Sequence, residues 1–195
     1  YDDIEKITDL CISFTESEQS KIFPNEAFGY WKVTVERPLR LKIDLSDESL
    51  NRFKTVCADA KEETLFTVLE RVKKEVGDGT HTDYNLLKST IESAASLSGV
   101  KMLAKRWKII ESGLAEKDEE ASPVIKKIHK AGKMTPDPLR GFFSISHEGK
   151  EVVVEYESDS ELRDTDKIPL LEEGGIEAFI KREVLPHVPE AWIDE

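Results

Sequence analysis

The sequence predicts an α+β fold in which a mainly helical middle is flanked by an N-terminal strand pair and by a C-terminal β-hairpin with a short helix. Two observations predict it. Apolar and polar residues alternate over residues 31–43, which is the period of β-strands, and residues 141–157 read as strand, tight turn and strand. Between residues 46 and 131, apolar residues instead recur every three or four positions, which is the period of helices.

The chain opens with a predicted helix over residues 2–14. Its apolar residues share one face of that helix: Ile4, Ile7, Leu10, Cys11 and Phe14. Cys11 and the other cysteine, Cys57, both lie inside apolar helical patterns, and two cysteines are too few for a disulfide scaffold. We therefore expect both to be buried thiols in a reducing cytoplasm.

Two strands are predicted next, over residues 31–36 and 39–43. Their apolar positions alternate with polar ones: Trp31, Val33, Val35, Leu39, Leu41 and Ile43. Pro38 lies between the two strands and cannot donate a hydrogen bond to a neighbouring strand. It therefore marks a bend, a bulge or the edge of a sheet.

Five helices are predicted in the middle of the chain. Four apolar stripes indicate the first four of them, at Leu50–Cys57, Leu65–Val76, Leu86–Ala95 and Leu103–Leu114. Ser46 is the expected N-cap of the first helix and Thr82 that of the third. A fifth, short helix is expected to begin with Ser122 as its cap and Pro123 at its first position, and to end near Gly132.

The C-terminal part begins with the predicted hairpin, which has Gly149 in its turn. A final short helix is expected after Gly174 and Gly175, and Pro186 ends it. Between the hairpin and this helix lies an acidic segment.

The last quarter of the chain is strongly acidic. Residues 151–195 hold 14 acidic and 4 basic side chains, so they contribute −10 to the formal net charge of −12. Such a segment repels a phosphate backbone. Apolar residues lie beside the acids, as at the rim of a protein interface, where burial gives affinity and charge sets orientation. The candidate docking residues are Asp159, Glu161, Asp164 and Asp166. Two alternatives stay open: the segment packs against its own chain, or it is a solvated loop.

The motifs that carry catalysis, cofactor binding or metal binding are missing from the sequence. It lacks G-x-S-x-G, G-x-x-x-x-G-K-[ST] and G-x-G-x-x-G. The four histidines have no H-x-x-x-H or C-x-x-C companions. A calcium loop counted from Glu157 or Asp159 has neither the glycine nor the glutamate that it needs. We therefore expect no catalytic, cofactor-binding or metal-ligating residue in this chain.

Two segments resemble one known family. Residues 28–42, FGYWKVTVERPLRLK, resemble the F-G-Y-x-x-[IV]-T-V-E-R-P-L-R-L segment of the modification subunit of type I restriction–modification systems. Residues 154–195 resemble the tail of that subunit, with its acidic patch, E-L-R-D-T-[DE], I-P-L and R-E-V-L-P-[HY]-V-P-[DE]-A-W-I-D. The helical middle, residues 45–131, has no matching motif.

The resemblance implies the C-terminal part of a subunit that methylates N6 of adenine with S-adenosylmethionine. In that family it works with a specificity subunit, which reads the DNA, and a restriction subunit, which cuts it. The family's F-x-G-x-G and N-P-P-[FY] motifs hold the cofactor and the flipped adenine. They precede the F-G-Y segment in the family and are absent here, and the chain begins at Tyr1 rather than at Met. We therefore expect a non-catalytic fragment that serves subunit assembly and holds no cofactor of its own.

This interpretation divides the chain into three regions. Residues 1–45 would be the end of the catalytic-domain region, residues 46–133 a helical region, and residues 134–195 the hairpin, acidic segment and final helix. Arg37 and Arg40 bracket Pro38 at a strand end, so they are the candidate contacts with DNA in the parent complex. No apolar run approaches the roughly 20 residues of a membrane span, and we expect a cytoplasmic protein. The alternative is a stand-alone protein-interaction module with a helical body and an acidic docking tail.

Overall fold

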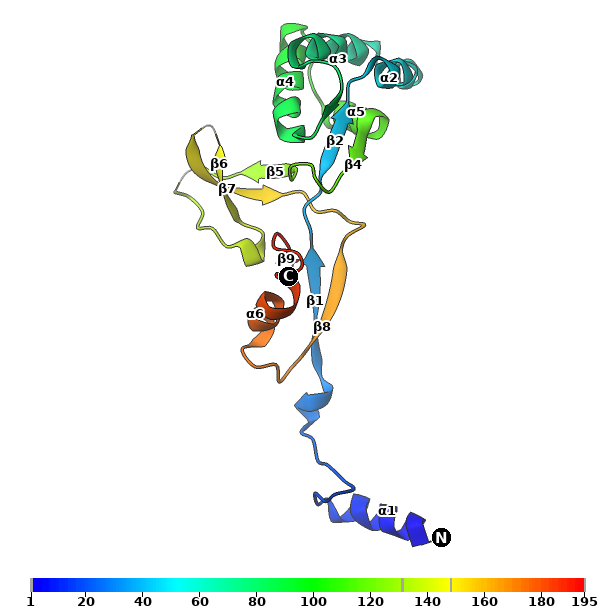
Figure 1. Ribbon diagram of the computed structural model, residues 1–195, viewed down its shortest axis with the longest axis vertical. Helices are drawn as coiled ribbons and strands as arrows, with labels where there is room; N and C mark the ends of the chain where they lie inside the picture. The colour runs from blue at the N-terminus through cyan, green and yellow to red at the C-terminus, as the bar shows by residue number, and fades with distance from the viewer. Residues whose placement is uncertain (1, 131, 148, 195) are drawn as a thin grey trace. The chain divides into compact units, whose positions relative to one another are not determined.

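The computed structural model describes residues 2–130, 132–147 and 149–194, and it confirms the predicted α+β fold (Figure 1). The helices are α1 (Asp2–Ser13), α2 (Asp47–Ala60), α3 (Glu63–Val76), α4 (Tyr84–Leu97), α5 (Ala104–Leu114) and α6 (Gly175–Phe179). The strands are β1 (Tyr30–Glu36), β2 (Leu41–Asp44), β3 (Thr80–His81), β4 (Ala115–Lys117), β5 (Ile125–Ile128), β6 (Phe143–His147), β7 (Lys150–Tyr156), β8 (Asp164–Pro169) and β9 (Trp192–Asp194). Short helical turns occupy Asn25–Phe28 and Pro138–Arg140, and a π-helical turn, Ile180–Val184, continues α6.

The chain forms two compact units that are discontinuous in sequence. The first unit contains the residues up to Val35 together with Asp164–Pro189. The second unit contains Glu36–Arg163 and Glu190–Asp194. This spatial division differs from the three consecutive regions that the sequence predicts, because residues from the tail join residues near the start in each unit.

The first unit is built on an antiparallel pair of strands, β1 and β8. Their register runs from Tyr30 opposite Pro169 to Val35 opposite Asp164. The strand β8 lies within the acidic segment, where the sequence did not predict a strand. Its one apolar inward position, Ile168, is fully buried, as Val33 of β1 nearly is. Pairing with β1 therefore orders a segment whose own pattern is dominated by charge.

The helix α1 also belongs to the first unit and confirms the predicted helix, but its apolar face is not part of a core. Ile7 is 61% exposed and Phe14 is 74% exposed. Cys11 is exposed too, so the expectation that it is a buried thiol is wrong; Cys57 is buried as predicted. Helical periodicity shows which side chains share a face, and it does not show what covers that face.

The helical part of the second unit packs against a small sheet in which β2 pairs with β3 and with β4 (Figure 1). Fully buried side chains from these elements form one core: Ile43, Leu45, Phe53, Leu65, Leu69, Ile91 and Ile110. Ser46 caps α2 as predicted, since its hydroxyl accepts the N–H of Ser49 at 3.3 Å. The cap of α4 is Asp83 rather than Thr82. Asp83 immediately precedes the helix, and its carboxylate accepts a hydrogen bond from the N–H of Leu86 at 3.0 Å.

A second sheet in this unit has the strand order β5–β7–β6, and β6 and β7 form the predicted hairpin. The predicted fifth helix is wrong, because its residues form the strand β5. The N–H of Ile125 donates to the side-chain oxygen of Asn85 at 2.8 Å, and the residues that follow pair with β7 across a bulge. These tertiary partners pair the backbone of the extended segment, whereas a helix as short as residues 123–132 is only marginally stable without packing of its own.

Across the described residues, no helix combines the length and the apolar character that spanning a membrane requires.

Candidate functional site

Parts of the two segments that carry the family resemblance lie side by side in the second unit. The N–H of Leu39 donates to the carbonyl of Glu157 at 2.7 Å, and the N–H of Asp159 donates to the carbonyl of Arg37 at 2.9 Å. Pro38 forms an isolated bridge with Ser158 between these two bonds. We call residues 36–40, residues 157–163, Lys117 and Glu190 the junction. It is the candidate functional site, because it contains both arginines proposed for DNA contact, Arg37 and Arg40, and two of the acids proposed for partner docking, Asp159 and Glu161.

The first ion pair of the junction joins Glu36 and Arg163. The Nε of Arg163 donates to Oε1 of Glu36 at 2.6 Å. The Glu36 side chain is only 3% exposed, whereas that of Arg163 is 49% exposed. Among the described residues, no group hydrogen-bonds to the other carboxylate oxygen of Glu36. A buried carboxylate with so few partners depends on the arginine for its charge compensation.

The second ion pair joins Arg40 and Glu190. The guanidinium of Arg40 donates to the Glu190 carboxylate and also to the backbone carbonyl of Ala121. Arg40 therefore ties together the strand end, the loop before β5 and the residues that precede β9. It would have to give up these partners to contact a phosphate.

Arg37, the other predicted DNA contact, lies half-buried beside Pro38. Among the described residues, its Nε has no hydrogen-bond partner, although the atom is buried. The acid that the sequence offers next to it, Glu36, pairs with Arg163 instead. Contact of Arg37 and Arg40 with DNA stays a prediction.

The acidic candidates for docking divide into one buried side chain and three accessible ones. Asp159 is buried, and its carboxylate accepts Lys117 Nζ at 2.6 Å and the N–H of Glu161 at 2.9 Å. Burial opposes its ionisation, but these hydrogen bonds prevail and hold the pKa of Asp159 below its usual value. The sequence left open whether the acidic segment packs against its own chain. Asp159 does so, since it is buried and bonded to Lys117.

The three accessible acids follow Asp159 along the chain. Glu161 is 78% exposed at its side chain and shares Lys117 with Asp159, at 2.7 Å. Asp164 is exposed at the start of β8, and Asp166 is half-buried in the same strand, opposite Val33. Their docking on a partner stays a prediction.

Sequence reasoning missed Lys117 and Glu190 as members of the junction. Lys117 lies in a run of mixed charge that reads as a solvated linker, and Glu190 lies in the P-E-A-W part of the tail motif. Their partners are 42 and 150 residues away, respectively, so no local pattern reports the pairing. The family motif was the available signal for Glu190.

A polar hollow of about 320 Å³ adjoins the junction. Glu36, Arg163, Tyr156 and Trp192 are among the residues that line it. The indole of Trp192 packs edge-on against Phe143, with ring centroids 6.0 Å apart. Within the part of the chain that the structure describes, no three His, Cys, Asp or Glu side chains are grouped to hold a metal ion.

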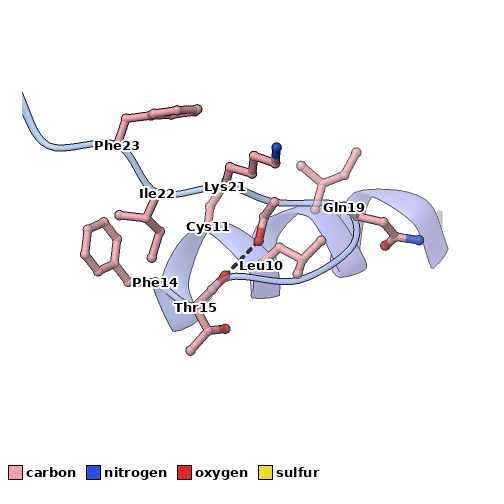
Figure 2. Close-up of a pocket in the computed structure, with 10 residues that line it drawn as sticks. Leu10, Cys11, Phe14, Thr15, Gln19, Lys21, Ile22 and Phe23 are labelled. Carbon is pink, nitrogen blue, oxygen red and sulfur yellow. Dashed lines mark hydrogen bonds between the residues drawn. The ribbon is translucent and has the colours of Figure 1, made fainter. Parts of the chain in front are cut away.

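A second hollow, of about 320 Å³, lies in the first unit between α1 and the segment that returns along it (Figure 2). Its lining is largely apolar: Ile7, Leu10, Cys11, Phe14, Ile22 and Phe23. Figure 2 shows Phe14 and Ile22 next to each other at one end and Gln19 at the other. This apolar groove contains neither of the two predicted sets of contact residues.

Comparisons with known proteins do not identify the chain: no family model, no curated protein and no solved structure matches it.

Proposed function

We propose that this chain is the C-terminal, non-catalytic part of the modification subunit of a type I restriction–modification system. The parent subunit would transfer a methyl group from S-adenosylmethionine to N6 of adenine, in the cytoplasm and together with specificity and restriction subunits. The observation that carries the proposal is the contact between the two segments that resemble the family. Residues 28–42 and residues 154–195 contribute paired strands and two ion pairs.

The residues that make these contacts are residues of the two motifs. Glu36 belongs to T-V-E-R-P and Arg163 to E-L-R-D, and they pair across 127 positions. Arg40 belongs to P-L-R-L and Glu190 to P-E-A-W, and they pair across 150 positions. A chance resemblance of two separate segments would not require their charged residues to be complementary in space. Their pairing supports a common origin of both motifs, with the helical middle inserted between them.

The role that we propose for the chain is assembly. The junction holds the tail in place, and Glu161, Asp164 and Asp166 would present negative charge to a basic surface of the specificity subunit. Contact with DNA would come through the parent complex, with Arg37 as the better placed of the two candidate arginines.

The test begins with the gene that encodes this chain. We expect its reading frame to extend upstream of Tyr1 and to encode F-x-G-x-G and N-P-P-[FY]. The full-length product, combined with the specificity subunit encoded beside it, should transfer labelled methyl groups to adenine in DNA. The chain of residues 1–195 alone should bind no S-adenosylmethionine in calorimetric titration. Micromolar binding by this chain, or a frame without those motifs, would contradict the proposal.

A second candidate function is that of a stand-alone protein-interaction module. The exposed apolar groove on α1 favours it, because apolar side chains gathered in an exposed groove are a common feature of protein-interaction sites. A start codon immediately before Tyr1 would support this function over the first.

A further inference from the structure

We infer that the apolar groove formed by α1 and residues 19–23 is a docking surface for an amphipathic helix of another protein, with an apolar stripe and basic side chains. This inference does not depend on the assignment to a modification subunit, and it deepens the second candidate function, which the same groove favours. It rests on the exposure and local order of the groove residues and on the charge of residues 2–23.

The exposure of the groove is the first support. Ile7 is 61% exposed, Phe14 is 74% exposed and Phe23 is 55% exposed, although all three line one hollow. The helix α1 is 12 residues long, so it offers a track of about 18 Å, or three turns. A partner helix of similar length would cover the stripe in the way that helices occupy apolar grooves.

The groove is also ordered by its own hydrogen bonds. The hydroxyl of Ser20 donates to the carbonyl of Thr15 at 2.7 Å, closing the turn after α1. The N–H of Ile22 donates to the carboxylate of Glu16 at 3.3 Å, which directs the chain back along the helix. The two walls of the groove are thus held together before any partner arrives, and less ordering is required on binding.

The negative charge of the residues that form the groove indicates which kind of apolar partner binds there. Residues 2–23 hold six acidic side chains and only two basic ones, Lys6 and Lys21. A second copy of this chain would bring the same acidic segment and a net charge of −12, so the two copies repel each other. An anionic membrane surface is repelled for the same reason. A helix with Lys or Arg beside its apolar stripe is attracted instead.

The test uses two synthetic helical peptides with the same leucine stripe, one with lysines and one with glutamates at the remaining surface positions. Fluorescence anisotropy of labelled peptide, titrated with the full chain at about 50 mM salt, should show the lysine peptide binding at least about tenfold more tightly than the glutamate peptide. The double variant Ile7→Ser with Phe14→Asn should bind the lysine peptide about tenfold more weakly, or weaker still. Circular dichroism of this variant verifies that the chain stays folded.

The matched control replaces two leucines of similar exposure on α4, Leu86→Ser and Leu97→Ser. They are 66% and 72% exposed, and we expect binding to stay within about twofold of the wild type. A charge swap, Asp3→Lys with Glu18→Lys, should weaken binding of the lysine peptide and strengthen binding of the glutamate peptide. Both replaced acids are exposed, so the swap leaves the core intact.

Several results would overturn the inference. They are equal binding of the two peptides, no binding of the lysine peptide, or a loss of lysine-peptide binding in the α4 control as large as in the groove variant. Sedimentation equilibrium that shows a dimer sensitive to Ile7→Ser with Phe14→Asn would identify a second copy as the occupant. Binding to phosphatidylserine-containing vesicles with the same sensitivity would identify a membrane.

Discussion

Arg163 compensates the charge of Glu36, a carboxylate that is 97% removed from solvent, across 127 positions of sequence. The contact lies where the tail meets the end of β1, and Glu36 Oε2 has no partner among the described residues. Among the ion pairs at the junction, loss of this one is therefore the most destabilising, because it leaves a buried carboxylate without a charged partner.

Removing the arginine should destabilise the chain for this reason. We expect Arg163→Ala to lower the free energy of unfolding by about 1–3 kcal/mol, less than for a fully buried pair because Arg163 is half exposed. Urea denaturation followed by circular dichroism measures it. The double variant with Glu36→Gln should recover part of the loss, since an amide costs less than an ion to leave buried. An Arg163→Ala variant as stable as the wild type would show that water compensates Glu36.

The pair of Asp159 and Lys117 should make stability depend on pH in the acid range. The pKa of Asp159 is lowered in the folded chain, so this carboxylate stabilises the fold above its unfolded pKa of about 3.9. The contribution is lost as the pH falls through the lower, folded pKa. We expect Asp159→Asn to cost about 1–2 kcal/mol near neutral pH and progressively less below about pH 4, measured by urea denaturation at several pH values.

Glu161 provides the control for this pH dependence, because it contacts the same lysine at 2.7 Å but is 78% exposed. Glu161→Gln should change the free energy of unfolding by less than about 0.5 kcal/mol at any pH. If the two variants behave alike, the burial of Asp159 is not what makes its ion pair matter.

The sequence predicted elements well where a repeating pattern is long, and it predicted their partners poorly. The helical stripes around Phe53, Leu69 and Ile91 are confirmed as one core. The strand at Val33 and Val35 is confirmed too, but its partner β8 lies about 130 residues away in a segment dominated by charge. Pairing of this kind depends on tertiary packing, which local periodicity does not encode.

The candidate site was predictable only in part, for the same reason. Sequence placed Arg40 and Asp159 among the charged residues that matter, and the structure engages both within the chain. Which lysine or glutamate would meet them depends on loops that bring Lys117 and Glu190 into the junction. The short strand β5 was predicted as part of a helix, because four residues are too few to distinguish the period of a strand from that of a helix.

The two cysteines should differ sharply in reactivity. Cys11 is exposed, whereas burial raises the pKa of the Cys57 thiol to about 11. At about pH 8, only about one Cys57 thiol in 1,000 would be ionised, even if reagent could reach it. We expect an aromatic disulfide reagent to titrate one thiol per folded chain and two in urea. The variant Cys11→Ser should show none until it unfolds; rapid labelling of that folded variant would contradict the buried position of Cys57.

Gly113 on α5 should resist replacement by alanine, although alanine favours helices. A Cβ at this position would lie 2.7 Å from Cδ2 of Phe53, which is fully buried in the core. Alanine gains about 1 kcal/mol in helix propensity, but crowding a packed aromatic ring costs about 1–3 kcal/mol, so we expect a net loss of about 1 kcal/mol in urea denaturation. In a Phe53→Leu background the same replacement should be neutral or stabilising, because the ring that obstructs the methyl group is gone. A loss of equal size in both backgrounds would mean that the close approach of α5 to α2 is not what requires glycine.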